Sequence, residues 1–227
     1  MDIKVPARWL SSSKPKGKKP GEKPAFDHSV LSYTKMDVPT VERYETAVTF
    51  EREHVQPLAA CAALVRTFGS KAGVGFLFRR DTGTAGRYWV YSPEPWKEPP
   101  QEAVSALAPK RHVIQLLPRL QYRFALEACL GRERVVDGEK EVEPFRSAPD
   151  VEAWVKWAAP QLGFKPDFFN VAMREVQFPY GGRTVKLPYA SIEGALHIAD
   201  PDLMRAPLLR GLGAYRRVGL GLLQLAN

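Results

Sequence analysis

The sequence has few cysteines and histidines and no long apolar run, and each shortage excludes a class of protein. Cys61 and Cys129 are the two cysteines, and they lie far apart without a metal-binding spacing, so we expect reduced thiols in a cytoplasmic protein. With four histidines and no Cys/His cluster, neither a metal site nor a cofactor is expected. A transmembrane helix needs about eighteen consecutive apolar residues, which this sequence lacks. The first residues also lack the apolar core of a signal peptide.

The sequence also has fewer acidic than basic residues. The chain has 33 lysines and arginines against 25 acidic residues, a formal net charge of +8 and a pI of about 9.5. Residues 1–24 carry +5 of this charge, because they hold seven basic and two acidic side chains. The segment 11–24 is rich in Lys, Pro, Ser and Gly and cannot build a core. We therefore predict a basic arm over residues 1–40 and a polyanionic partner, most often nucleic acid.

An apolar fraction of 44% is typical of a globular chain. The first half predicts a strand over 41–50, a helix over 55–69, strands over 73–79 and 87–91, a short helix near 101–107 and a strand near 111–117. Leu58, Cys61, Val65 and Phe68 share the predicted apolar face of the first helix. This β-α-β-β-α-β series is the ferredoxin-like unit.

The series then starts again. Apolar residues alternate over 120–130, and Ser147 with Asp150 resembles a capping box that opens a helix. The later elements predicted are strands over 170–178 and 184–198 joined at Gly181-Gly182, a helix over 200–209 capped by Asp200, and a strand over 218–225. The fold class expected is α+β, with two tandem ferredoxin-like (RRM-like) domains over 41–117 and 118–227.

The end of the chain is rich in glycine. Gly211 and Gly213 form one Gly-x-Gly pair and Gly219 and Gly221 a second, with Tyr215-Arg216-Arg217 between them. Glycine permits positive φ and brings backbone amides close to a ligand, and arginine grips phosphate through two hydrogen bonds. Gly219 and Gly221 are expected on one bare face of the last strand. The alternative is a glycine-rich turn before a core strand.

Two nucleotide-binding loops do not fit this stretch. The third glycine of Gly-x-Gly-x-x-Gly is replaced by Arg216, and no Gly-Lys-Ser/Thr follows as in a phosphate loop. The glycine stretch therefore predicts a phosphate-contacting loop of another kind.

At these residues the sequence resembles a known family. Residues 194–202, a short helix, and the glycine pairs with the apolar end of the chain resemble the C-terminus of the CRISPR-associated RAMP superfamily. Within it, the sequence is most similar to the repeat-processing endoribonucleases of the E subtype. Further stretches that carry the resemblance, which covers roughly 41–227, are Arg66-Thr67-Phe68, Phe76–Arg79, Tyr91–Trp96 and Trp154 with Gly163-Phe164.

The resemblance implies cleavage of CRISPR repeat RNA without a metal. A 2′-hydroxyl attacks the adjacent phosphate and leaves a cyclic phosphate, and the protein stays on the 3′ stem-loop of the CRISPR RNA (crRNA) with other effector subunits. The chain departs from this pattern in its first forty residues and on its first helix. The position of the family's catalytic histidine holds Cys61, which we expect to be core. We favour the divergent processing subunits of type IV systems; the alternative is a non-catalytic RAMP subunit that binds the crRNA end.

The chemistry needs a base, an acid and cations on the phosphate. His54 is a candidate base or acid, with Arg52 or Arg43 on the phosphate; otherwise it is an exposed histidine at a helix start. His28, beside the basic arm, is the rival. A mechanism with arginines alone is a third hypothesis. The remaining histidines, His112 and His197, lie in predicted strands and are expected to be structural.

Three groups of residues are candidates for binding RNA. The first group is the loop, with Arg210, Gly211, Gly213, Tyr215, Arg216, Arg217, Gly219 and Gly221. The second is the predicted hairpin, where Arg174, Arg183 and Lys186 would straddle an A-form stem. The third is Lys110, Arg111, Arg119 and Arg123, for which solvated charge is an equal alternative.

Overall fold

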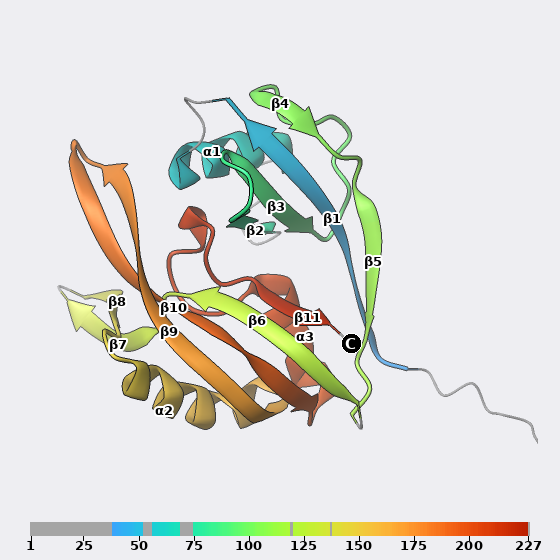
Figure 1. The fold of residues 1–227 in the computed structure, drawn as a ribbon, viewed down its shortest axis with the longest axis vertical. Coiled ribbons are helices and arrows are strands. Elements are labelled where there is room, and N and C mark those ends of the chain that lie inside the picture. The colour runs from blue at the N-terminus through green and yellow to red at the C-terminus, as the bar shows by residue number, and fades with distance from the viewer. Residues whose placement is uncertain (1–37, 52–55, 69–74, 119, 137, 227) are drawn as a thin grey trace, which may run out of the picture. The chain divides into compact units, whose positions relative to one another are not determined.

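The computed structural model describes residues 38–226 apart from 52–55, 69–74, 119 and 137. Two larger antiparallel sheets and one separate hairpin make up its strands (Figure 1). The predicted basic arm falls almost wholly outside the described residues, as do its candidate His28 and the candidates Arg52 and His54. None of the helices in the described part of the chain is long and apolar enough to cross a membrane.

The first sheet is built around its first strand. Its strands are, in chain order, β1 (Thr40–Phe50), β2 (Leu77–Arg80), β3 (Arg87–Ser92), β4 (Ala103–Ala106) and β5 (Lys110–Gln115). β1 pairs with β3 on one side and with β4 and then β5 on the other, and β2 lies beyond β3. This is the strand order of a ferredoxin-like sheet, with the last strand in two pieces.

One predicted helix of this unit is wrong. Residues 103–106 form β4, not a helix near 101–107. Ala106 and Ser105 pair with Val48 and Thr49 of β1, and the amide of Leu107 donates to the Ala47 carbonyl at 2.9 Å. Pairing with the free edge of a long central strand therefore decides the conformation of this short segment.

The only helix among the described residues of the first unit is α1 (Pro57–Phe68), which covers one face of the first sheet. Ala60, Ala63 and Leu64 are fully buried there, and Cys61 is nearly so. The predicted apolar face was partly wrong, because Val65 is 37% exposed. Small alanines, rather than Val65, bring the helix close to the sheet.

The second sheet has the complete ferredoxin-like order, β11-β6-β10-β9. Its elements are, in chain order, β6 (Gln121–Ala128), α2 (Ala148–Ala158), the 3₁₀ helix η4 (Ala159–Leu162), β9 (Phe164–Tyr180), β10 (Arg183–Ile198), α3 (Pro201–Arg210), the 3₁₀ helix η5 (Arg216–Val218) and β11 (Leu223–Ala226). Both predicted helix caps are confirmed: the Ser147 side chain accepts from the amide of Asp150, and that of Asp200 from the amides of Asp202 and Leu203.

Two features of this unit were not predicted. A hairpin of β7 (Gly131–Val136) and β8 (Glu139–Pro144) is inserted before α2. The last strand is much shorter than expected, because residues 216–218 form η5 and β11 begins only at Leu223. Gly219 and Gly221 therefore lie before the strand, and the bare strand face predicted for them does not exist.

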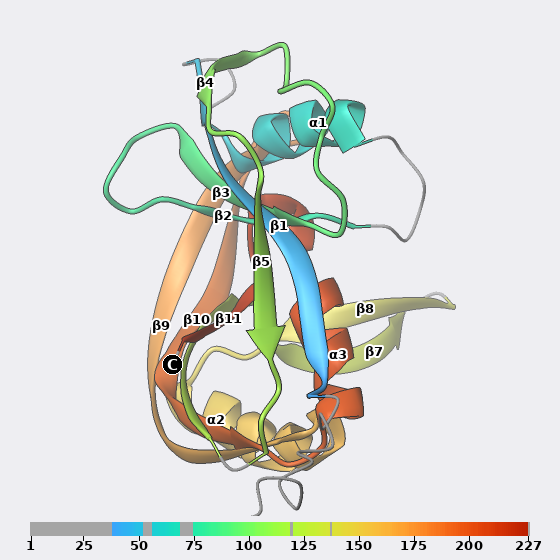
Figure 2. The ribbon, with the colours of Figure 1, turned by 90° about the vertical axis from the view of Figure 1, so that its right-hand side faces the viewer.

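Buried residues join the two sheets. Leu77 and Tyr91 of the first sheet pack on Leu222, next to the second, and Val41 and Ile114 belong to the core under α2 and α3. The paired β1 and β5 run past α3 (Figure 2). Residues 38–227 thus form one compact unit. The α+β class with two ferredoxin-like units is confirmed, whereas a domain boundary between 117 and 118 stays a prediction.

Candidate nucleic-acid interface

The glycine loop, residues 211–222, joins α3 to β11. The positive φ predicted for Gly211 and Gly213 is confirmed, at 74° and 80°, and Gly219 and Gly221 also have positive φ. The Gly211 amide donates to Pro207 O and is therefore not free for a ligand, and the Gly221 amide donates to Glu127 O at 2.6 Å; a contact between the Gly213 amide and phosphate stays a prediction. The loop backbone is thus tied to the protein.

Close packing explains why Gly221 must be glycine. A Cβ built there would lie 2.6 Å from the carbonyl oxygen of Leu212, whose own amide donates to Gly221 O at 2.8 Å. A Cβ built on Gly213 would likewise lie 2.5 Å from the carbonyl oxygen of Cys129. These glycines let backbone segments pack closely against one another, so close packing is one reason for glycine at both positions.

The loop holds its cations outward. Arg210, Arg216 and Arg217 are exposed, as is Tyr215 at 45%, while Val218 and Leu220 are buried below them. Arg216 donates to the carbonyl oxygen of Arg210, which fixes its direction. Three positive charges with no acidic residue between them in the sequence make this stretch a candidate contact for phosphate.

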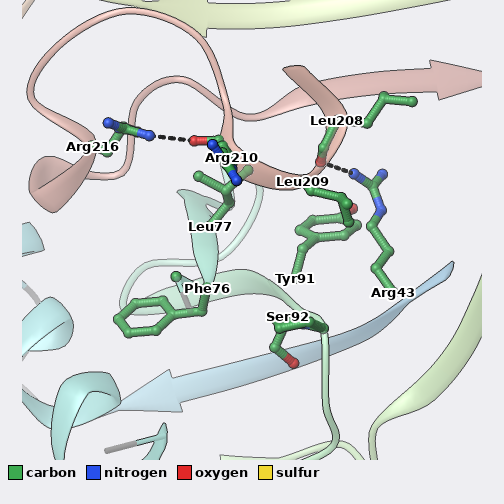
Figure 3. A pocket seen from close by; sticks show the side chains of 11 residues that line it. Arg43, Phe76, Leu77, Tyr91, Ser92, Leu208, Leu209, Arg210 and Arg216 are labelled. Carbon is green, nitrogen blue, oxygen red and sulfur yellow. Dashed lines mark hydrogen bonds between the residues drawn. The ribbon is translucent and has the colours of Figure 1, made fainter. Parts of the chain in front are cut away.

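A pocket of about 710 Å³ opens beside the loop. Arg43, Arg210 and Arg216 line it, together with Tyr91 and Leu77 (Figure 3). None of the described residues that line it is acidic. With the exposed Arg210 and Arg216 and an apolar wall, the pocket suits an anion attached to a flat or apolar body.

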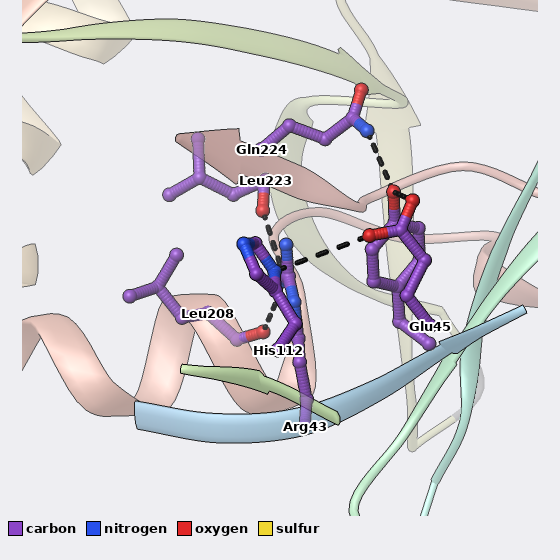
Figure 4. Close-up of polar contacts among 7 residues, drawn as sticks. Arg43, Glu45, His112, Leu208, Leu223 and Gln224 are labelled. Atoms are coloured by element: carbon purple, nitrogen blue, oxygen red, sulfur yellow. Dashed lines mark hydrogen bonds and ion pairs between the residues drawn. The ribbon is translucent and has the colours of Figure 1, made fainter. Parts of the chain in front are cut away.

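Arg43, a predicted catalytic residue, forms the inner wall of this pocket. It is 3% exposed, its guanidinium lies 4.3 Å from the centre of the Tyr91 ring, and its Nη1 donates to the carbonyls of Leu208 and Leu223, both at 3.4 Å (Figure 4). Burial lowers the pKa of Arg43, and Tyr91 and Glu45 oppose that shift. The side chain therefore joins β1 to the end of α3 and to β11. A guanidinium held in this way is not free to move onto a phosphate.

Around Arg43 is a polar network that the sequence did not indicate. The Tyr91 hydroxyl donates to Glu45 Oε1 at 3.0 Å and accepts from Gln224 Nε2 at 2.9 Å. His112 Nδ1 lies 4.0 Å from Glu45 Oε2 and makes no hydrogen bond to the described residues, so His112 is next to this network, and its structural role stays a prediction. Nothing local in the sequence links β1, β3 and β11, which is why this network was missed.

The predicted hairpin of β9 and β10 is confirmed, and its three cations are exposed. They do not share one face. Arg174 opposes Tyr189, which puts it on the face of Arg183, whereas Lys186 opposes Gln177 on the other face. Phe178 and Leu187 of the hairpin pack with Val218 and Leu220 of the loop and with Leu58 of α1. The hairpin, the loop and α1 therefore form one assembly.

Cys61 lies in the core between α1 and the first sheet, and α1 also contacts η5. It is 8% exposed, and burial raises the pKa of its thiol, although Arg217 acts in the opposite direction. The prediction that Cys61 belongs to the core is confirmed. A buried neutral thiol beside Arg217 is no base for a 2′-hydroxyl.

The third predicted group is not brought together. Arg111 pairs with Glu42 of β1, so its charge is already matched, and Lys110 precedes it on β5. Arg123 lies on the second sheet, in a groove with Phe168, and Arg119 is outside the described residues. These cations do not form one surface with the glycine loop.

The chain matches a known protein family and several solved structures. A family model described as CRISPR associated protein matches residues 33–227. None of the curated protein sequences compared with the chain matches it.

Several solved structures have the same fold. The chain is similar to the CRISPR endoribonuclease Cse3 bound to a 19-nucleotide RNA, with a TM-score of 0.67 and 19% identity over 82% of this chain and 100% of that one. For the CRISPR-associated protein Cas6e from Escherichia coli K-12 the TM-score is 0.61, with 18% identity over 82% and 99% of the two chains. A chain of a CRISPR RNA-guided surveillance complex gives 0.58, with 20% identity over 82% and 99%. At these identities the likeness establishes the fold.

Proposed function

Because the chain belongs to the family of CRISPR-associated proteins, we propose that it is an endoribonuclease that processes CRISPR repeat RNA and stays bound to the 3′ stem-loop of the product. One observation carries this proposal. Three exposed arginines, one at the end of α3 and two on the glycine loop that follows it, accompany a pocket whose described lining has no acidic residue, in a fold shared with an RNA-bound endoribonuclease.

Cleavage of RNA by its own 2′-hydroxyl needs no metal ion. A base takes the proton of the 2′-hydroxyl, the 2′-oxygen attacks the adjacent phosphorus, and the 5′-oxygen leaves as it receives a proton, so that a 2′,3′-cyclic phosphate remains. Cations stabilise the charge of the phosphorane. Arg210, Arg216 and Arg217, which are exposed, are proposed to supply that charge. His54 and His28 remain the candidates for base and acid, and arginines acting alone remain the third hypothesis.

The stem of the repeat RNA is assigned to the hairpin of β9 and β10. An A-form stem is recognised mainly through its phosphates and 2′-hydroxyls. Arg174 and Arg183 on one face and Lys186 on the other fit contacts from both sides of the hairpin. Other CRISPR effector subunits are proposed as partners, since one similar structure is part of a surveillance complex. Membership of the type IV branch is part of the same proposal.

A second function is favoured by one observation. Cys61 is buried where the resemblance expects the catalytic histidine. A subunit without this group would hold the crRNA end and not cut it. Both functions use the same loop and hairpin.

Incubation with the chain's own labelled repeat RNA in EDTA separates the two. Cutting at one site that leaves a cyclic phosphate supports the nuclease, and tight binding of intact RNA supports the binding subunit. His54→Ala and His28→Ala then sort the candidates. A nuclease that keeps its rate in both variants relies on neither histidine.

A further inference from the structure

A cluster of polar side chains lies on the open face of the second sheet, opposite α2 and α3. Along β6 the exposed Gln121 and Arg123 alternate with the buried Tyr122 and Phe124. His197 of β10 lies directly across from Gln121, so these side chains share the open face. The glycine loop and the hairpin tip contribute none of these residues.

His197 is held in one orientation by a carboxylate. Its Nδ1 lies 2.9 Å from Asp167 Oδ1, and Gln121 Nε2 donates to Asp167 Oδ2 at 2.8 Å. The hydrogen bonds from Gln121 and His197 lower the pKa of Asp167, so the carboxylate is ionised at neutral pH and Nδ1 must carry a hydrogen. The neutral imidazole then has its lone pair on Nε2. The side chain of His197 is 38% exposed, which leaves it accessible to a ligand.

A β-bulge sets up this arrangement. Phe168 opposes Ala195 and Pro166 opposes Leu196, so Asp167 is the extra residue of β9. A Cβ on Gly194 would lie 2.2 Å from Phe168 O, so only glycine lets β10 approach β9 this closely. A bulge turns a side chain away from its regular direction, and here it brings the Asp167 carboxylate to both Gln121 and His197.

Beside the bulge lies an exposed aromatic ring. Phe168 is 63% exposed and lines a groove of about 570 Å³ with Arg123, Glu193 and Gln224. A large apolar ring between polar residues on an open sheet is the arrangement on which RRM-type proteins stack unpaired bases. Among the described residues that line this groove, Arg123 is the only cation, and the carboxylate of Glu193, which also lines it, repels phosphate.

We propose that this face is a second RNA site, which takes one unpaired ribonucleotide. The base stacks on Phe168, the 2′-hydroxyl donates to His197 Nε2, and Arg123 contacts the phosphate. The inference rests on the proposed function for its RNA partner. It adds a site that recognises ribose, because a deoxyribonucleotide offers no 2′-hydroxyl to His197.

Binding of a short single-stranded oligoadenylate and its deoxy counterpart, measured by fluorescence anisotropy, tests the inference. The wild-type protein should bind the ribo-oligomer more tightly. Phe168→Ala should lower the affinity for both oligomers roughly tenfold or more, and Phe168→Trp should restore this affinity. His197→Ala should remove the preference for ribose and leave the affinity for the deoxy-oligomer unchanged. Trp157 of α2, 64% exposed, provides the matched control Trp157→Ala, which should change neither.

The repeat stem-loop RNA keeps the two claims apart. If the protein binds the stem-loop but not the single-stranded oligomer, or if Phe168→Ala changes nothing, the second site is wrong and the proposed function stands. An equal loss of affinity in Trp157→Ala and Phe168→Ala overturns the second site as well. Binding of neither RNA overturns both.

Discussion

Gly221→Ala should destabilise the protein and weaken RNA binding, because this glycine lets the end of the glycine loop pack against the backbone of Leu212 at its start. An alanine there takes a left-handed backbone, which costs about 1–2 kcal/mol and is partly offset by a less flexible unfolded chain. Its Cβ also meets Leu212 O at 2.6 Å. Relief of that contact stretches the bonds from Leu212 N to Gly221 O and from Gly221 N to Glu127 O, each worth about 1 kcal/mol.

The decrease expected in the free energy of unfolding is therefore about 2–4 kcal/mol. Gly138 gives a matched control, since its φ of 83° is close to the 91° of Gly221 but an added Cβ would meet nothing within 4 Å. Gly138→Ala should cost only about 1 kcal/mol. Urea denaturation measures both, and the affinity for repeat RNA should fall only in Gly221→Ala. Equal losses of stability in the two variants would refute the argument from close packing.

Three further predictions concern other side chains. Arg43→Met should lower the free energy of unfolding by about 1–3 kcal/mol, because it removes charged hydrogen bonds to Leu208 O and Leu223 O; unchanged urea denaturation would contradict the structural role. Asp167 has a pKa lowered by Gln121 and His197, so it stabilises the fold above the ordinary aspartate pKa of about 3.9 and this contribution disappears as the pH falls through the folded-state pKa; Asp167→Asn should flatten the stability curve in that acid range, and an unaltered curve would count against the network. Burial raises the pKa of Cys61, and that of Cys129 to about 11, so both thiols should react with iodoacetamide at pH 8 only in urea, and Cys61→Ala should leave RNA cleavage unchanged; rapid alkylation of the folded protein would contradict this placement.

Local signals in the sequence were sufficient for much of the fold. Ser147 and Asp200 are helix caps because their own neighbours supply the amides, and Gly181-Gly182 makes a turn without help from the rest of the chain. The segment at 101–107 was mispredicted as a helix because its conformation depends on a distant edge of β1. The last strand was predicted too long because Leu220 and Leu222 are apolar for a different reason: they cover the hairpin and the first sheet.

The candidate site was predictable only where side chains face solvent. The loop arginines were chosen from their position beside the glycines, and their contact with RNA stays a prediction. The burial of Arg43 was missed, although it has the same parity in β1 as the buried Val41, which was the available signal. Asp167 and Phe168 were missed because the predicted strand began at residue 170 and the bulge is visible only in the pairing of β9 with β10.

The central claim is that the arginines of the glycine loop hold RNA phosphates, and the salt dependence of RNA affinity tests it most directly. Affinity for the repeat stem-loop should be measured over a range of salt concentrations for the wild type, for a variant with Arg210, Arg216 and Arg217 changed to Gln, and for Arg111→Gln. The logarithmic salt slope should fall by about one unit for each phosphate that an arginine no longer neutralises. It should barely change in Arg111→Gln, because Glu42 already pairs with that cation. An unchanged slope in the loop variant would contradict the account.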